Sequence, residues 1–218
     1  KLAFIHTVPS LVGLFNDLSK ELLPDVEVFH IADEMLLKVV LAQGGPSHFI
    51  FQRVAEHVVA AERAGATMVQ CTCSSISPCV DASRSFVSVP VLKIDEPMVN
   101  AALAIGSRVG IAATAPTTLK PTTELVRARA SALGVPVQVE SVLCEGAYDA
   151  LFSGNPQRHD QIVSEVLRGL MTRNGVVILA QASMARVAQA IPVGEQRVPI
   201  LSSPRLAMEH VRELLVTA

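Results

Sequence analysis

The sequence predicts an α/β protein built from two pseudo-symmetric, doubly wound halves, each around a parallel sheet. Short, almost continuously apolar runs alternate with amphipathic helical patterns, which is typical of parallel strands covered by helices on both faces. Motifs of the first half of the chain return in the second half at a nearly constant offset. Of the 218 residues, 50% are hydrophobic, which is sufficient for the core of one large or two small domains.

The predicted strands are the short apolar runs bounded by Gly, Pro or polar turn residues. In chain order they are Leu2–His6, Thr67–Cys71, Val89–Ile94, Arg108–Ala112, Pro136–Glu140, Val176–Ala180 and Pro199–Leu201. The predicted helices are segments whose apolar residues recur at helical spacing. They cover about residues 10–22, 47–64, 96–105, 117–132, 155–172, 183–190 and 203–216. This alternation predicts parallel strands that are joined by helices.

Three pairs of segments indicate an internal duplication. Each pair matches a strand together with the residues next to it, and the offset within the pairs stays between 107 and 109 residues. The pairs are Phe4–Ser10 with Ile111–Thr117, Met68–Ser75 with Val177–Ser183, and Val89–Leu92 with Val198–Leu201. Any two doubly wound halves share some features, but three matches in the same order favour a repeated unit.

The duplication predicts two domains. The first half covers residues 1–95 and the second half residues 96–202, while the last helix, 203–218, is expected to pack back on the first half. Ligands of open α/β sheets bind outside the carboxyl ends of the strands. We therefore expect the active cleft to lie between the halves, lined by the residues that come directly after matched strands.

Composition argues against several classes of partner and cofactor. The net charge is −2, without a basic stripe, so we expect no nucleic-acid partner. No apolar run reaches the roughly 18 residues of a membrane span, so we expect no membrane association. Four cysteines are too few for a disulfide framework and predict a cytoplasmic protein. Cys71, Cys73 and Cys79 lack the spacing of common zinc sites, and no nucleotide-binding glycine motif is present, so we expect neither metal nor cofactor.

Two helix starts carry paired hydroxyl residues. Thr7 and Ser10 precede the first predicted helix, and Thr114 and Thr117 occupy the corresponding turn of the second half. The free N–H groups and the positive dipole end of such a helix bind carboxylate or phosphate. Ordinary N-capping needs the same residue types, and this alternative stays open.

Cys73 is the strongest candidate for a reacting group. It comes after a predicted strand and opens the turn Cys73–Pro78, which leads towards a helix. A cysteine in such a position is expected to have a lowered pKa, and its thiolate can remove a proton beside a carboxylate or attack an electron-poor alkene. The alternative is that Cys73 is a small buried hydrophobic residue. His6 ends a strand beside Thr7, and we expect it to face the cleft as well.

These motifs resemble those of the aspartate/glutamate/hydantoin racemase superfamily over nearly the full length of the chain. Cys73-Ser74-Ser75 stands in the place of the family's Cys-Asn-Thr, and Ala113-Thr114-x-x-Thr117 in the place of its Ala/Gly-Thr-x-x-Thr. Leu179–Ala185 looks like its Leu-Gly-Cys-Ala-Gly-Met-Ala. The resemblance implies a cofactor-independent isomerase of amino acid metabolism that acts beside the carboxylate of a small substrate. It also implies assembly into homodimers or higher homo-oligomers.

The candidate site residues combine the strand ends with this resemblance. The predicted catalytic residues are Cys73, Gln181 and His6. The predicted substrate-binding residues are Thr7, Ser10, Ser74, Ser75, Thr114, Thr117, Ala182 and Ser183. By resemblance, the hydroxyl groups cradle a carboxylate or carbonyl group of the substrate.

Gln181 stands where the family carries its second cysteine. Family members with two thiols remove the α-proton with one thiol and return a proton with the other, whereas an amide cannot exchange a proton at neutral pH. Two catalytic interpretations remain open. In one, His6, Glu34 or Glu145 serves as the second acid. In the other, Cys73 acts alone, as in a decarboxylation or a cis–trans isomerisation.

Two further classes of function have to be weighed against these. The protein can bind a carboxylate without turnover, with Gln181 as an amide donor to the ligand. It can also be a redox sensor that uses Cys71 and Cys73, although a disulfide between cysteines so close on one strand is strained. The sequence favours the enzyme that acts through Cys73.

Overall fold

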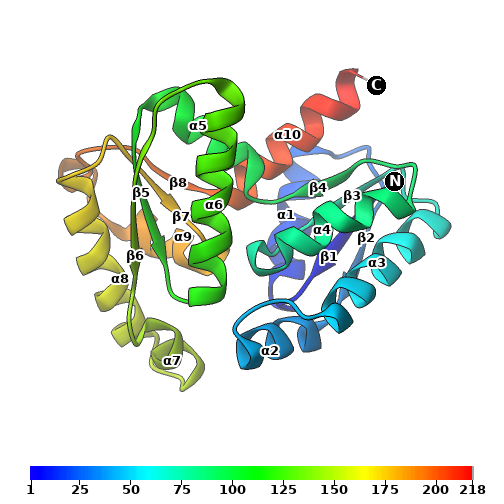
Figure 1. The fold of residues 1–218 in the computed structure, drawn as a ribbon, viewed down its shortest axis with the longest axis horizontal. Helices are drawn as coiled ribbons and strands as arrows, with labels where there is room; N and C mark the ends of the chain where they lie inside the picture. Colours follow the sequence, from blue (N-terminus) through cyan, green and yellow to red (C-terminus); the bar gives the residue numbers. More distant parts are fainter. Residues whose placement is uncertain (218) are drawn as a thin grey trace. The chain divides into compact units, whose positions relative to one another are not determined.

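The computed structural model of the chain describes residues 1–217 and confirms an α/β fold with two four-stranded sheets whose strands pair in parallel (Figure 1). The chain divides into two compact units. The first contains Lys1–Ile94 and the C-terminal helix from Pro204 onward, and the second contains Asp95–Ser203. Each unit has its own sheet and its own apolar core.

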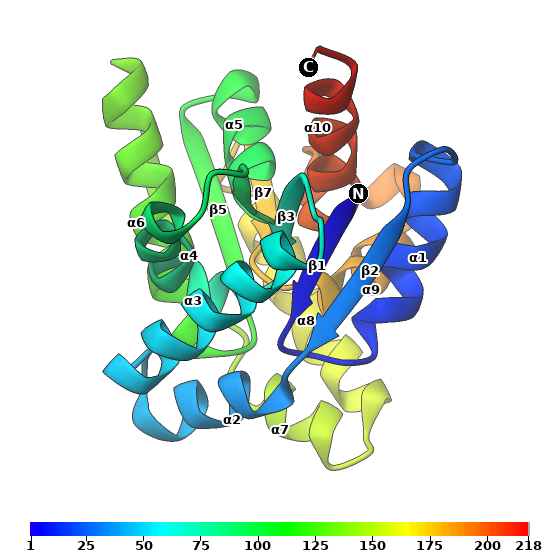
Figure 2. The same ribbon diagram turned by 90° about the vertical axis from the view of Figure 1, so that its right-hand side faces the viewer.

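The first sheet has the strand order β2-β1-β3-β4. Its strands are β1 (Leu2–His6), β2 (Val28–Ala32), β3 (Met68–Cys71) and β4 (Val91–Lys93). The helices of this unit are α1 (Leu11–Leu22), α2 (Glu34–Gln43), α3 (His48–Arg63), α4 (Ser77–Ser83) and α10 (Ser203–Thr217), with the 3-10 turns η1 (Ser74–Ile76) and η2 (Arg84–Phe86). Figure 2 shows α1 and α3 on opposite sides of this sheet.

The central strand β1 is the core of the first unit. Every residue of β1 is buried, and successive side chains point to opposite faces of the sheet. Ala3 and Ile5 pack with the apolar residues of α2, α3 and α4. Leu2 and Phe4 pack on the other face with apolar residues of α1 and α10. Because β1 is enclosed in this way, polar residues at its end are held in a rigid and largely dry environment.

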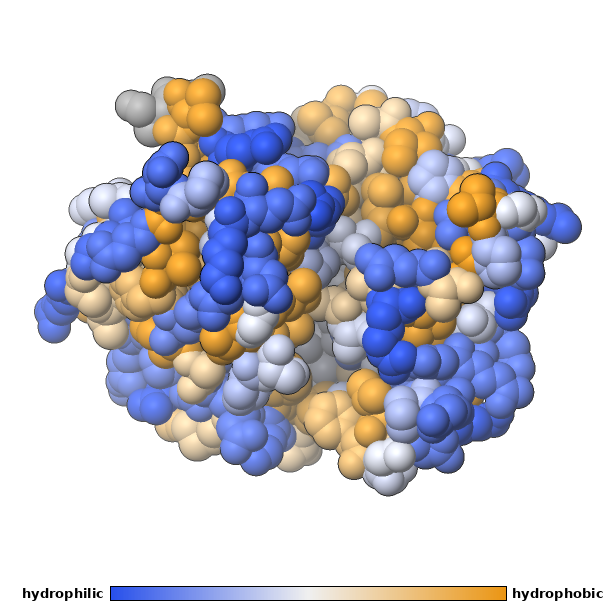
Figure 3. All heavy atoms as spheres, turned by 180° about the vertical axis from the view of Figure 1, so that it is seen from behind, coloured by the Kyte–Doolittle hydropathy of each residue, from blue (hydrophilic) through white to orange (hydrophobic). Residues whose placement is uncertain are grey.

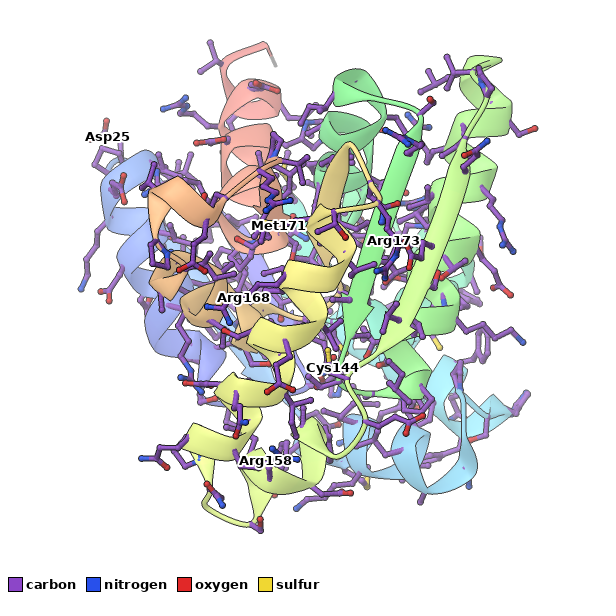
Figure 4. The ribbon with its side chains drawn as sticks, turned by 90° about the vertical axis from the view of Figure 1, so that its left-hand side faces the viewer. Asp25, Cys144, Arg158, Arg168, Met171 and Arg173 are labelled. Carbon is purple, nitrogen blue, oxygen red and sulfur yellow. The ribbon has the colours of Figure 1, made fainter. Side chains whose placement is uncertain are left out.

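The second sheet has the strand order β6-β5-β7-β8. Its strands are β5 (Arg108–Ala113), β6 (Gln138–Leu143), β7 (Val176–Leu179) and β8 (Ile200–Ser202). Its helices are α5 (Glu96–Ile105), α6 (Pro116–Leu133), α7 (Ala147–Phe152), α8 (Pro156–Met171) and α9 (Ala185–Ala190), with the 3-10 turns η3 (Ala182–Met184) and η4 (Val193–Glu195). Figure 4 shows Arg168 and Met171 on α8, and Cys144 where β6 ends.

The second unit repeats the first, element by element, as the duplicated motifs predict. In both units the outer strand comes after the first helix, and the third strand leads into a 3-10 turn and a short helix. The helix after the fourth strand is exchanged: α5 follows β4 but belongs to the second unit, and α10 follows β8 but belongs to the first. An ion pair from Arg205 to both carboxylate oxygens of Glu21, 2.8 Å each, joins α10 to α1.

The outer strands depart from the sequence prediction. The apolar-run pattern does not predict β2, and it places β6 at Pro136–Glu140 instead of Gln138–Leu143. Both strands lie at a sheet edge and most of their residues are only partly buried. An edge strand can keep polar residues on its open side, so it lacks the continuous apolar run of a central parallel strand.

Hydrophilic and hydrophobic residues are interspersed on the face of the molecule seen in Figure 3. This mixture agrees with the balanced composition of 18 Lys and Arg against 20 Asp and Glu. Within residues 1–217, no helix combines the length and the apolar character needed to cross a membrane.

Candidate active site

Thr7 and Cys73 follow the carboxyl ends of β1 and β3, two neighbouring strands of the first sheet. The ladder between β1 and β3 ends with the hydrogen bond from the Thr72 N–H to the Ile5 carbonyl oxygen (3.0 Å). Cys73 then caps the 3-10 turn η1 in an extended conformation (φ −138°, ψ 118°), and α4 comes next. The predicted turn towards a helix is therefore present, and the Cys73 side chain is half-buried at its start.

The electrostatic environment of Cys73 differs from the sequence prediction. Burial raises the pKa of the thiol, whereas a lowered pKa was expected from its place before a helix. The hydroxyl groups of Thr7 and Ser75 and the N–H groups of Ser75 and Ile76 favour the thiolate and oppose this shift in pKa. The prediction of a lowered pKa is wrong because desolvation outweighs these donors.

The predicted hydroxyl residues of the first unit separate into two groups. The first group is buried near Cys73, just beyond the carboxyl end of β3, and consists of Thr7, Ser74 and Ser75. The Thr7 oxygen makes no hydrogen bond of ordinary geometry within the described residues, although it is near enough to the sulfur to favour the thiolate. Ser10 is exposed at the start of α1, and its side chain does not cap that helix. The structure therefore brings Thr7 and Ser75 to Cys73 but not Ser10.

The other three cysteines are buried, and all four are reduced. Burial raises the pKa of Cys71 and of Cys79 to about 12, and that of Cys144 to about 11. The charge of a Cys73 thiolate contributes to these raised pKa values of Cys71 and Cys79. Cys73 is thus the one cysteine whose residue is partly exposed.

In the second unit, Gln181 occupies the position that corresponds to Cys73. It caps the 3-10 turn η3 with almost the same backbone conformation (φ −138°, ψ 136°). Its carboxamide oxygen accepts three hydrogen bonds: from the Thr114 N–H at 2.6 Å, the Thr114 hydroxyl at 3.0 Å and the Ala115 N–H at 3.3 Å. Backbone N–H groups can only donate, so the atom that faces them must be the oxygen. The Gln181 NH₂ group faces away and donates to no other residue of the described chain.

These contacts show how the turn before α6 is held. Its N-cap residue is Ala115, which has no side chain that could cap the helix. Gln181 satisfies the buried N–H groups of Thr114 and Ala115 instead. Thr117 is half-buried in the first turn of α6, Ala182 is half-buried in η3 and Ser183 is exposed. The structure therefore brings Thr114 and Gln181 together and leaves a rigidly held amide donor group at the end of β7.

His6, which was predicted to face the site, lies in the interior of the first unit. Its side chain is fully buried and makes hydrogen bonds to Thr72 and His30. Burial, followed by the proximity of His30, lowers the pKa of His6 to about 4, so its ring is neutral near neutral pH. The other two candidates for a second acid are exposed: Glu34 pairs with Lys38 on α2 at 3.0 Å, and Glu145 lies just after β6.

Sequence reasoning missed three side chains that contact or extend this network, namely Thr72, His30 and Asn16. His30 lies on β2, the edge strand that the apolar-run pattern does not predict. The short run Val28–Ala32, in which four of the five residues are apolar, is the signal that could have revealed it. No group of three or more His, Cys, Asp or Glu side chains is arranged to hold a metal ion within residues 1–217.

A family model described as Asp/Glu/hydantoin racemase matches residues 42–211 of the chain. No curated protein sequence matches it. The fold is similar to several solved structures. Allantoin racemase from Klebsiella pneumoniae is 19% identical with a TM-score of 0.72, and the alignment covers 99% of this chain and 87% of that one.

Two further structures give the same result. Glutamate racemase from Francisella tularensis, solved in complex with D-glutamate, is 15% identical with a TM-score of 0.75, and the alignment covers 99% of this chain and 81% of that one. An aspartate racemase homologue from Pyrococcus horikoshii is 16% identical with a TM-score of 0.69, and 99% of each chain is covered. At these identities the likeness shows the fold.

Proposed function

The chain belongs to the Asp/Glu/hydantoin racemase family, and from this premise we propose that it moves a proton at the carbon next to the carboxylate of a small molecule, through Cys73 and without a cofactor. One observation carries the proposal. Cys73, the one cysteine residue that is partly exposed, follows the carboxyl end of β3, and its thiol lies among hydrogen-bond donors, while the other three cysteines are buried. Open α/β sheets bind ligands at this edge.

The proton transfer needs a thiolate and a polar environment for the substrate. The Cys73 thiolate takes the α-hydrogen as a proton, and the electron pair of the C–H bond moves onto the carboxylate as an enediolate. The same thiol then returns a proton to the carbon. Donors such as Thr7 and Ser75 favour the thiolate before the transfer, and polar groups of the site would then support the negative charge that builds up on the substrate as the enediolate forms. We keep Ser74, Ser10, Thr117, Ala182 and Ser183 as proposed substrate contacts.

Gln181 has a different proposed role from that of a second thiol. An amide cannot exchange a proton, so a two-thiol racemisation is not proposed. Because its oxygen is held by Thr114 and Ala115, the NH₂ group keeps a fixed direction and can donate to a substrate oxygen. A single thiol acts on one face of the substrate, so deuterium from solvent is expected to enter with retention unless water protonates the other face.

A decarboxylase is the second candidate function, and the raised pKa of Cys73 favours it. Near neutral pH a buried thiol keeps its proton and suits the role of a proton donor. In this reaction the substrate loses CO₂, the electron pair of the broken C–C bond forms an enolate, and the Cys73 S–H protonates the carbon. The thiol then regains a proton from water. Its rate should fall as pH rises through the pKa of the thiol, whereas the rate of α-proton removal should rise.

Hydrogen exchange tests the proposal directly. The protein is incubated with α-amino, α-hydroxy and malonic acids in D₂O, and the α-position is followed by proton NMR. We expect at least one of these acids to gain deuterium or lose CO₂, and we expect alkylation of Cys73 by iodoacetamide to stop the reaction. If no acid reacts while several raise the melting temperature, the protein binds carboxylates without turnover and the enzymatic proposal fails.

Gln181→Glu tests the NH₂ group of Gln181 separately from its oxygen. The variant keeps an oxygen for the Thr114 and Ala115 N–H groups but replaces the outward donor with an acceptor. We expect an unchanged fold and at least about tenfold weaker binding of the reacting acid, because a hydrogen bond to a charged group contributes about 1.5–3 kcal/mol. Calorimetric titration measures the affinity, and Gln189→Glu on the exposed side of α9 is the control with the same change of charge. Equal affinities of the wild type and the Gln181 variant would rule out the donor role.

A further inference from the structure

A chain of side-chain hydrogen bonds starts at Thr72, the residue before Cys73, and crosses the first sheet. Thr72 Oγ1 lies 2.8 Å from His6 Nδ1, and His6 Nε2 lies 2.8 Å from His30 Nδ1. His30 Nε2 lies 3.0 Å from Asn16 Oδ1. Thr72 and His6 are buried, whereas His30 and Asn16 are half-buried. The chain thus connects β3, β1, β2 and α1 in that order.

The direction of these hydrogen bonds can be deduced by counting protons. The Thr72 hydroxyl has two acceptors within hydrogen-bond distance, the Ile5 carbonyl at 3.1 Å and His6 Nδ1 at 2.8 Å, and we take the shorter contact, with His6 Nδ1, as the hydrogen bond that it donates. His6 then donates from Nε2 to His30, and His30 donates from Nε2 to the Asn16 oxygen. In this arrangement all four side chains are uncharged and every contact pairs a donor with an acceptor.

The opposite direction requires a different donor at its outer end. The Thr72 hydroxyl also lies 3.1 Å from the Ile5 carbonyl and could donate there, which would require His6 Nδ1 to donate to Thr72. Two acceptors, His30 Nε2 and Asn16 Oδ1, would then face each other at 3.0 Å unless the Asn16 amide were turned to present its NH₂ group or His30 carried an extra proton. The outward direction is the one that agrees with the Asn16 oxygen facing His30.

This chain begins where the backbone ladder stops. The ladder between β1 and β3 ends at the Thr72 N–H, and the next residues of the two segments are Thr7 and Cys73. The contact between His6 and Thr72 joins the two strand ends one residue before each of these site residues. The ends of the two strands are therefore joined both by the backbone hydrogen bond from Thr72 to Ile5 and by this side-chain contact.

The internal duplication supplies a comparison within the same molecule. The positions that correspond to Thr72, His6, His30 and Asn16 are Ala180, Ala113, Ser141 and Thr123. In the second unit only the positions of His30 and Asn16 are still joined by a hydrogen bond, between Ser141 Oγ and Thr123 Oγ1 at 2.7 Å. The inner pair is replaced by two alanines in the unit that has Gln181 in place of the thiol. The buried part of the chain thus accompanies the cysteine and is not required by the fold.

We propose that Thr72, His6 and His30 are positioning residues that hold Thr7 against the Cys73 sulfur. The inference rests on the proposed function of Cys73 and extends it to side chains that do not touch the substrate. Buried polar groups that satisfy one another make a rigid unit, because breaking any one contact leaves a partner unsatisfied. Loss of the Thr72 hydroxyl would leave the backbone hydrogen bond from Thr72 to Ile5 in place but remove the side-chain contact with His6, and so weaken the support that Thr7 gives to the thiolate.

Alkylation of Cys73 tests this role without any knowledge of the substrate. The rate of reaction with iodoacetamide is measured from pH 6 to pH 10.5, and fragmentation of the labelled peptide assigns the label to Cys73. We expect Thr72→Ala to raise the pH midpoint by at least about half a unit, which slows labelling near neutral pH about threefold. Thr72→Ser, which keeps the hydroxyl, should behave like the wild type. The double variant Thr123→Ala/Ser141→Ala removes the corresponding outer pair of the second unit and should also leave labelling unchanged.

Two outcomes would overturn the proposal. One is a Thr72→Ala protein that folds and labels at the wild-type rate with the same midpoint. The other is an imidazole nitrogen NMR spectrum of the wild type in which His6 carries its proton on Nδ1 at neutral pH, because the direction of the chain requires the proton on Nε2. The spectrum decides the question even if Thr72→Ala does not fold. Failure to find any turnover would leave both measurements unaffected, so it would count against the proposed function alone.

Discussion

Cys73→Ala is expected to lower the rate of proton transfer to or from the substrate by about a thousandfold, with the fold retained. Positioned acid–base groups contribute about 10²- to 10⁴-fold to reaction rates, and the variant removes the proton-carrying atom. The half-buried position of the side chain limits the loss of packing. Deuterium incorporation into the reacting acid gives the rate, and circular dichroism reports the fold.

Cys71→Ala is the matched control. This thiol lies two residues earlier on β3, is only 1% exposed and has a pKa raised to about 12 by burial. We expect the variant to lose some stability through a small cavity and to keep its rate within a few-fold of the wild type. Retention of a tenth or more of the rate in Cys73→Ala, or an equal loss in both variants, would remove Cys73 from the reaction.

Acidification from pH 7 to pH 5 is expected to lower the free energy of unfolding by about 2 kcal/mol through His6 alone, and by up to about 3 kcal/mol at pH 4. Burial and the neighbouring His30 lower the pKa of folded His6 to about 4, against 6.5 in the unfolded chain. Between these values the unfolded state binds the extra proton. The stabilisation is therefore complete above pH 6.5 and is lost as the pH falls towards 4.

The surroundings of His6 explain why it cannot take up a proton easily. The rings of Phe4 and Phe15 lie 5.8 Å and 5.5 Å from its own ring, centre to centre, and neither residue ionises. His30 is the ionisable group that contacts it, and burial lowers the pKa of His30 as well. A positive charge on His6 would meet apolar rings on one side and a second imidazole on the other.

Urea unfolding at pH 7 and pH 5 measures this effect. The free energy of unfolding at pH 7 minus that at pH 5 should be smaller by about 2 kcal/mol in His6→Asn than in the wild type. His48→Asn, at an exposed position on α3, should leave the difference unchanged. An unaltered pH dependence in His6→Asn would show that the folded protein tolerates a charged His6.

The site could be predicted from the sequence only where it depends on neighbours along the chain. Cys73 is recognisable because a strand, a thiol and a turn succeed one another, and the structure has that order. The direction of its pKa shift could not be predicted in the same way. Desolvation depends on side chains from other elements, and it outweighs the N–H groups of the local turn.

For Gln181 and His6 as well, the sequence predicts what depends on residue type or on neighbours along the chain, and the structure adds the contacts between distant segments. The sequence reveals that Gln181 cannot replace a thiol, because that depends on residue type alone. The use of its oxygen to hold the Thr114 turn needs two segments that are 67 residues apart. His6 looks like a site residue because it precedes Thr7, but the side chain points into the interior, where only the packing of α1 and β2 determines its partners.

By itself, the sequence determined the α/β fold and the family and indicated Cys73 as the candidate thiol, because apolar periodicity and strand–turn motifs are properties of contiguous residues. The tertiary structure decided which polar groups are buried from water and which of them form hydrogen bonds with one another. The chain from Thr72 to Asn16 joins residues separated by 66, 24 and 14 positions, and its proton order exists only once three strands and a helix bring those atoms within about 3 Å of one another.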